Sequence, residues 1–142
     1  MDEQFITFET AKLAKAKGFD VECLYVYNPN GVLISKWYEC TAEIECVTGD
    51  MILNQFKIRH DFYKAPTQSL LQKWLREVHE IEIEVWREVN FSSESYYNTY
   101  SVNVSNTKLT FPVGESLSVN HINIYESALE QGLVNALNLI EV

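Results

Sequence analysis

Apolar residues recur at the three- and four-residue spacing of an amphipathic helix in three separate stretches of this chain. The clearest of them is APTQSLLQKWLREVH, residues 65–79. Its apolar side chains fall on one side of a helix and are Leu70, Leu71, Trp74, Leu75 and Val78. Pro66 suits the first helical position, and either Ala65 or Thr67 can cap the helix N-terminus. The spacing therefore predicts a helix that packs its apolar half against a core.

A shorter helix is predicted over residues 8–17 from the residues at its two ends. Thr7 precedes it as a capping residue, and Gly18 follows it as a residue that easily adopts the left-handed conformation. Ile6 and Ala11 have the spacing of a hydrophobic staple, in which a residue before the cap packs against the first turn. Local sequence thus predicts both ends of this helix.

The last predicted helix begins after Asn123, which forms with Glu126 the N-x-x-E pattern of a capping box. The apolar stripe of this helix consists of Tyr125, Leu129, Leu133, Ala136, Leu137 and Ile140. Gly132 lies on the same stripe, where the missing side chain allows a close approach to a sheet. We therefore expect this helix to lie directly on the strands.

Strands are predicted between the helices, where polar and apolar residues alternate or where β-branched and aromatic residues gather. The segments are 21–28, 32–47, 51–58, 81–89, 96–104 and 108–111. The sequence NPNG at 28–31 predicts a hairpin between the first two segments. Residues 112–121 suit either a loop or one more short strand.

The order of these elements predicts the fold class. Short turns favour antiparallel pairing, and amphipathic helices can cover one face of the resulting sheet. We therefore expect a two-layer α+β fold, in which a mainly antiparallel β-sheet of about five or six strands carries three α-helices on one face. At 142 residues, the chain has the length of a single compact domain, residues 1–142.

The charge balance limits the class of partner. The chain has 20 acidic and 11 basic residues and a formal net charge of −9, which repels phosphate and disfavours general nucleic-acid binding. No stretch has the roughly 20 apolar residues that span a bilayer, and the acidic N-terminus does not resemble a signal peptide. We therefore expect no membrane association and a cytoplasmic location, in which Cys23, Cys40 and Cys46 stay reduced.

No catalytic or metal-binding pattern stands out in the sequence. The three histidines lie far apart, and Cys40 and Cys46 lack the close spacing of a zinc site. The glycines occur singly and form no phosphate-binding loop. A cysteine enzyme that uses Cys40 or Cys46 together with His60 or His121 is the one arrangement left open. We therefore predict no catalytic residue, no metal and no cofactor.

Three blocks of sequence carry a resemblance to a known family. They are TFETAKLAKAKGFD at 7–20, APTQSLLQKWLREVHEI at 65–81 and YESALEQGLVNALNLI at 125–140. In order and spacing, they resemble the small uncharacterised proteins of bacteriophages and prophages that combine the motifs KLAKEKGFD, APTQSLLQKWLRE-H and YEEALEEGL-EAL-LI. The resemblance implies a phage or prophage origin and the cytoplasm of a bacterial host, and it implies no particular activity.

The polar half of the middle helix is a candidate binding surface. Ser69, Lys73 and Arg76 form an outward stripe that two glutamines flank. The positive N-terminus of a helix offers backbone N–H groups that can hold an anion. The alternative is a solvated surface on which Arg76 pairs with Glu80, four residues along. The candidate ligand or partner residues are Gln68, Ser69, Gln72, Lys73 and Arg76.

A second candidate surface is the acidic side of the predicted strand 81–89. Carboxylates stand at alternate positions around Trp86, and they are Glu80, Glu82, Glu84 and Glu88. Such a strip suits the docking of a basic partner, or it protects a sheet edge from aggregation. Acid–base catalysis or binding of a divalent ion is a third interpretation.

Two functions fit these observations. The first is a non-enzymatic phage or prophage accessory protein that binds a host protein or sequesters a small host metabolite, in host takeover or in evasion of host defence. The second is a small enzyme acting on nucleotides or other phosphorylated metabolites, with Lys73 and Arg76 holding the phosphate. Either fits a monomer or a small homo-oligomer. Turnover separates the two, because an enzyme acts at substoichiometric amounts and a binding protein saturates.

Overall fold

The computed structural model describes residues 3–35, 62–91, 96–106 and 119–141. The chain divides into two compact units, one formed by Phe5–Pro66 and the other by Met1–Gln4 together with Thr67–Val142. Both units combine helix with antiparallel strands, which confirms the α+β class. The described strands form two sheets of three strands each, so the prediction of one sheet of five or six strands is not confirmed.

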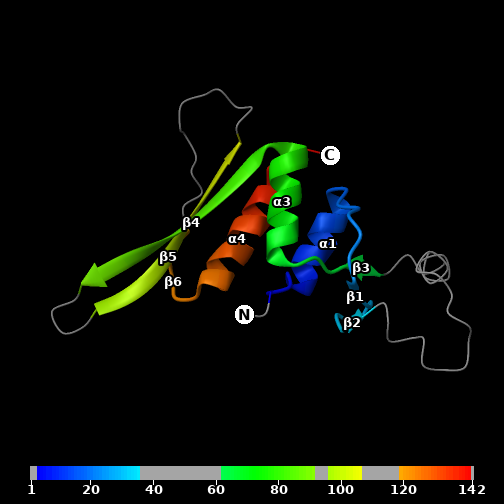
Figure 1. The fold of residues 1–142 in the computed structure, drawn as a ribbon, viewed down its shortest axis with the longest axis horizontal. Coiled ribbons are helices and arrows are strands. Elements are labelled where there is room, and N and C mark those ends of the chain that lie inside the picture. The colour runs from blue at the N-terminus through cyan, green and yellow to red at the C-terminus, as the bar shows by residue number, and fades with distance from the viewer. Residues whose placement is uncertain (1–2, 36–61, 92–95, 107–118, 142) are drawn as a thin grey trace, which may run out of the picture. The chain divides into compact units, whose positions relative to one another are not determined.

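In the described part of the Phe5–Pro66 unit, a helix packs beside a small sheet (Figure 1). Its described elements are α1 (Phe8–Ala16), β1 (Tyr25–Tyr27), β2 (Leu33–Ser35) and β3 (Tyr63–Lys64). Strand β1 lies in the middle and pairs antiparallel with both neighbours. Aromatic rings join the helix to the strands, since the ring of Phe8 makes edge contacts with the rings of Tyr27 and Tyr63.

Local sequence explains the ends of α1 and the turn that follows β1. The side chain of Thr7 accepts a hydrogen bond from the backbone N–H of Thr10 at the start of the helix. Gly18 follows the helix with φ of +86°, as the sequence predicts. In the NPNG turn, Gly31 has φ of +77° and donates its N–H to the carbonyl of Asn28. The predicted hairpin between β1 and β2 is therefore confirmed.

The described residues of the second unit form a long β-hairpin, one more strand and two helices (Figure 1). Its described elements are α3 (Gln68–His79), β4 (Ile81–Phe91), β5 (Tyr96–Asn106), β6 (Val119–Ile122) and α4 (Tyr125–Asn138). The sheet has the order β4-β5-β6, and β4 pairs with β5 over its whole length. The hairpin of β4 and β5 extends well beyond the helices at its turn end (Figure 1).

Helix α4 lies against β4 and β5 through its small residues. A Cβ atom added to Gly132 would lie 2.7 Å from the Cγ2 atoms of both Ile83 and Val102. No side chain fits in that space, because real Cβ atoms do not approach other atoms so closely. The close approach predicted at Gly132 is therefore confirmed, and the buried residues of α4 include Ala128, Leu129, Leu133, Ala136 and Leu137.

Three details of the helices in this unit differ from the expectations or complete them. Thr67 is the N-cap of α3, and its hydroxyl accepts the N–H of Leu70, which settles the choice left open by the sequence. The N-cap of α4 is Ile124, which makes no side-chain hydrogen bond to the helix. The prediction of a capping box formed by Asn123 and Glu126 is therefore wrong. Val78 is 56% exposed, so the apolar stripe of α3 does not continue into the core at its last turn.

Several predicted strands lie wholly or partly outside the described residues, namely 51–58, 108–111 and most of 32–47. The sequence left residues 112–121 as either a loop or a short strand. The described residues of this segment, 119–121, belong to strand β6, which favours the strand. Within the described ranges, we find no helix that combines the length and the hydropathy needed to cross a membrane.

Candidate functional site

The two glutamines of the candidate surface on α3 point into their own unit. Gln68 is only 5% exposed, and its Nε2 donates to the carbonyl of Glu126 at 3.0 Å and to the carboxylate of Glu130 at 2.8 Å. Gln72 is half-buried, and its Nε2 donates to the carbonyl of Ile83 at 3.0 Å. These side chains therefore attach α3 to α4 and to β4. The sequence pattern had instead predicted that they flank an outward stripe.

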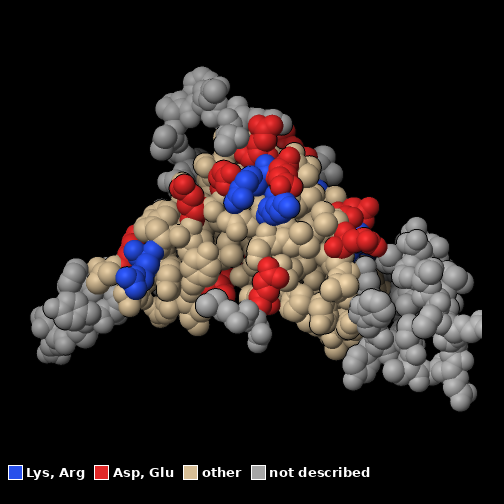
Figure 2. Space-filling model, viewed as in Figure 1, with Lys and Arg blue, Asp and Glu red and all other residues tan. Residues whose placement is uncertain are grey.

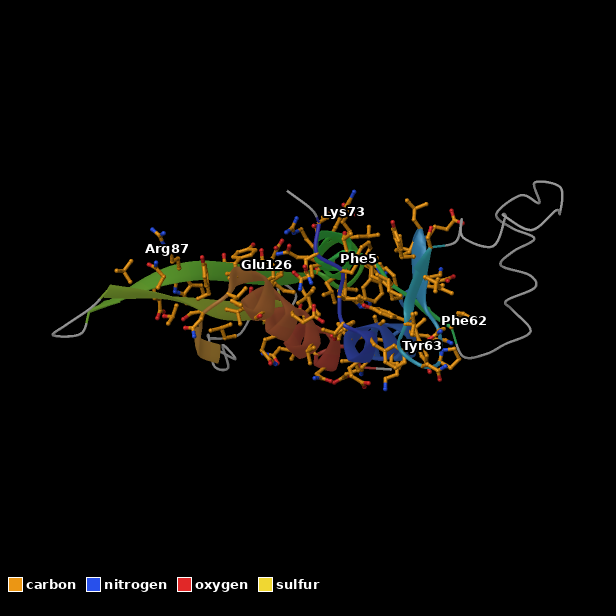
Figure 3. The ribbon with its side chains drawn as sticks, turned by 90° about the horizontal axis from the view of Figure 1, so that it is seen from below. Phe5, Phe62, Tyr63, Lys73, Arg87 and Glu126 are labelled. Atoms are coloured by element: carbon orange, nitrogen blue, oxygen red, sulfur yellow. The ribbon has the colours of Figure 1, made fainter. Side chains whose placement is uncertain are left out.

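The other three candidates on α3 are exposed, and each contacts a carboxylate of this chain. The hydroxyl of Ser69 donates to Glu3 at 2.7 Å, and the ammonium of Lys73 lies 3.8 Å from Glu77. The Nε of Arg76 donates to Glu82 at 2.9 Å. Figure 2 shows basic side chains over α3 with acidic ones beside them, and Figure 3 shows Lys73 pointing away from the helix.

Arg76 therefore contacts Glu82 on β4, whereas the alternative of a solvated surface paired it with Glu80. Glu80 ends α3 in the left-handed conformation with φ of +56° and lies before the first residue of β4. Glu80 therefore lies just outside β4, whereas Glu82, Glu84 and Glu88 belong to the strand.

The N-terminus of α3 already has internal hydrogen-bond partners. The backbone N–H of Gln68 donates to the carbonyl of Gln4 at 2.8 Å, and the N–H of Leu70 donates to the hydroxyl of Thr67 at 3.3 Å. An anion bound at a helix start uses these same N–H groups. Phosphate binding at this helix stays a prediction, and the five candidate residues do not converge on one point.

The acidic strip on β4 forms a coherent surface. We call it the acidic face, and it consists of Glu82, Glu84, Trp86 and Glu88. Ile81 and Ile83 are buried on the opposite side of the strand, because successive side chains of a strand alternate between faces. Glu84 is exposed, and Trp86 is 42% exposed, which is high for a side chain of its size.

Contacts within the acidic face orient its tryptophan. The indole Nε1 of Trp86 donates to the carboxylate of Glu88 at 3.1 Å. The residues of β5 directly opposite are small and polar, and Glu84, Trp86 and Glu88 face Asn103, Ser101 and Thr99. The carboxylates and the indole are therefore larger than the three β5 residues paired with them. Such groups can hold a lysine or arginine side chain by ion pairing and by cation–π contact.

A hollow in the Phe5–Pro66 unit was not predicted from the sequence. Two lysines line it, and the ammonium of Lys15 donates to the carbonyl of Phe62, while that of Lys64 contacts the carboxylate of Asp20 at 2.6 Å. These residues come from separate parts of the sequence, and no local pattern links them. Because both ammonium groups have partners in the same unit, we do not assign a ligand to this hollow.

The residues of the cysteine–histidine arrangement that the sequence left open are largely outside the described residues. Cys40, Cys46 and His60 lie outside them, and the side chain of His121 is not described. Cys23 is buried and not in a disulfide, as expected of a structural cysteine. Among the described residues, no group of three or more histidine, cysteine, aspartate or glutamate residues is arranged to hold a metal ion.

Comparisons with protein-family models, with curated proteins and with solved structures found no match to this chain. The resemblance to phage-encoded proteins therefore stays a prediction that rests on its three sequence blocks. The geometry of the chain's own residues defines the candidate site, and the acidic face of β4 is the surface that this geometry favours.

Proposed function

We propose that this chain is a phage or prophage accessory protein that acts in the bacterial cytoplasm by binding, not by catalysis. Its binding surface is the acidic face, and its partner is a host protein with a basic patch. The observation that carries the proposal is the exposed indole of Trp86, placed between the carboxylates of Glu84 and Glu88 on one side of β4.

The physical argument combines a hydrophobic anchor with charge. Tryptophan is enriched among the residues that dominate binding energy, and the carboxylates around it can select a basic partner. The net charge of −9 adds long-range attraction toward such a partner and speeds the encounter. These features support binding through β4 more directly than they support any reaction.

The alternatives that use α3 have weaker support. An enzyme for phosphorylated metabolites, or a protein that sequesters them, needs cations that face a ligand. Lys73 and Arg76 instead face Glu77 and Glu82, so a phosphate would have to displace a carboxylate and would be repelled by it. We therefore favour a protein partner over a small phosphorylated one.

The test is affinity capture from a lysate of the bacterial host, with the wild-type chain and a Glu84→Lys/Glu88→Lys variant. We expect a captured protein that saturates at about one copy per chain, whose binding weakens as salt is added. The charge-reversed variant should lose that protein. Titration calorimetry with the purified partner then measures the stoichiometry.

The matched control is Glu22→Lys/Glu141→Lys, which makes the same change in net charge at two exposed positions that are not part of the acidic face. This control should keep the partner. Equal loss in both variants would show that only net charge matters, and full retention in the Glu84→Lys/Glu88→Lys variant would exclude the acidic face as the binding surface.

A further inference from the structure

Strand β4 is an edge strand in the part of the chain that the structure describes. The sheet has the order β4-β5-β6, so β5 occupies one side of β4 and no described strand occupies the other (Figure 1). An edge strand presents a row of backbone N–H and C=O groups that can pair with another chain. The outer edge of β4 is therefore a second feature, distinct from the acidic face.

A side-chain contact indicates which residues of β4 direct their backbone groups outward. The carbonyl of Ile83 accepts a hydrogen bond from Gln72, which lies on α3 and not in the β4–β5 ladder. In an antiparallel pair, residues alternate between those that bond the neighbouring strand and those that face away from it. The register between β4 and β5 is regular, so Val85, Arg87 and Val89 face the same way as Ile83.

Helix α3 shields only the beginning of this edge. Gln72 occupies the carbonyl of Ile83, and Arg76 reaches Glu82 at the same end of the strand. Farther along, β4 continues away from α3 toward the turn of the hairpin (Figure 1). Figure 3 shows Arg87 on this outer part of β4, pointing away from the ribbon. The backbone from Val85 to Val89 is thus the part of the edge that α3 leaves uncovered.

The side chains beside this edge define what could pair with it. One face of β4 carries Glu84, Trp86 and Glu88, and the other carries Val85, Arg87 and Val89, of which Val89 is 46% exposed. In a sheet, directly opposite side chains of neighbouring strands contact each other, and opposite charges stabilise the pair. A complementary strand would therefore alternate lysine or arginine with apolar or β-branched residues.

We infer that the outer edge of β4, from Val85 to Val89, takes an extended basic segment of a partner protein as an added strand. This inference rests on the proposed function and deepens it, because it states the conformation and the sequence pattern of the partner. Main-chain hydrogen bonds to β4 supply affinity in this mode of recognition, and alternate side chains supply specificity. A second copy of this chain suits the edge less well, since its own β4 also carries Glu84 and Glu88.

The test uses a synthetic eight-residue peptide in which lysine alternates with valine or threonine, and two N-methylated forms of it. One form carries the methyl groups on all lysine amides, and the other carries them on all valine and threonine amides. Only one of these two sets of amides can face β4 in an added strand. One methylated form should therefore bind like the parent peptide, and the other should lose at least about tenfold in affinity.

A second readout follows the protein's own amides by hydrogen exchange. On addition of the parent peptide, exchange at Val85, Arg87 and Val89 should slow by at least about tenfold, whereas Glu84 and Trp86, which bond β5, should change little. Protection of all five amides in the free protein would overturn the inference, because the edge would then already be covered. Protection that grows with protein concentration, together with a dimer in sedimentation, would overturn it in favour of a second copy.

Charge variants separate this inference from the proposed function. The parent peptide should bind less tightly to Glu84→Gln/Glu88→Gln than to the matched control Glu22→Gln/Glu141→Gln. If that holds but both methylated peptides bind equally, the acidic face binds the peptide and the added strand is wrong. If the parent peptide does not bind at low salt and millimolar concentration, or ignores the charge variants, the proposed function fails with it.

Discussion

The side-chain nitrogen Nε2 of Gln68 lies 2.8 Å from the carboxylate oxygen Oε2 of Glu130, and this contact joins the first turn of α3 to α4. The same nitrogen also donates to the carbonyl of Glu126 at 3.0 Å. Gln68 is 5% exposed, so both hydrogen bonds lie in a largely dehydrated environment. A residue at the polar edge of an amphipathic helix therefore has a role in packing.

Replacement of Gln68 by leucine should destabilise the protein by about 1–3 kcal/mol, because both hydrogen bonds are lost at a buried position. The neighbouring variant Ser69→Ala is the control, since Ser69 is exposed and its hydroxyl donates to Glu3, which is exposed as well. It should change the free energy of unfolding by no more than about 0.5 kcal/mol. Urea denaturation measures both variants, and equal effects would contradict the structural role of Gln68.

Gly132→Ala should also destabilise the protein, by about 1–3 kcal/mol, because the added methyl group overlaps Ile83 and Val102. The sign is informative, since alanine normally favours a helix over glycine by about 1 kcal/mol. The control is Asn138→Ala, at an exposed position near the end of α4, which should be nearly neutral. Thermal melts compare the two, and a stabilised Gly132→Ala would mean that α4 does not lie this close to the sheet.

Truncation should destabilise the protein far more at Trp74 than at Val78, although both residues lie on the predicted apolar stripe of α3. Trp74 is 8% exposed and its ring packs against that of His79, so Trp74→Ala should cost about 3–5 kcal/mol. Val78 is 56% exposed, so Val78→Ala should cost no more than about 0.5 kcal/mol. Chemical denaturation of the two variants tests the rotation of α3, and similar losses would contradict it.

Nucleotides should not raise the melting temperature of this protein. A ligand that binds only the native state stabilises it, but Lys73 and Arg76 face carboxylates and the start of α3 has internal partners. Differential scanning fluorimetry with millimolar linear and cyclic nucleotides measures the effect. A clear rise that disappears in a folded Lys73→Ala/Arg76→Ala variant would instead favour the anion site and the phosphorylated ligand.

The sequence by itself determined the features that depend on neighbouring residues. The cap at Thr7, the glycine turn at Gly31 and the close approach at Gly132 follow from backbone conformation and side-chain size. Successive side chains of β4 point to opposite faces of the sheet, and this backbone geometry separates the buried Ile81 and Ile83 from the acidic face. In each of these cases, the interaction or the conformational preference arises within a few residues of the chain or from the absence of a side chain.

Only the tertiary structure decided which polar residues of α3 remain on the surface. Gln68 and Gln72 turn inward because their acceptors, on Glu130 and Ile83, belong to elements that the helix periodicity does not describe. Val78 stays exposed because burial depends on what packs over a residue, not on its place in the helical repeat. The grouping of strands into two sheets was likewise undetermined by local sequence, since strand pairing depends on contacts between distant parts of the chain.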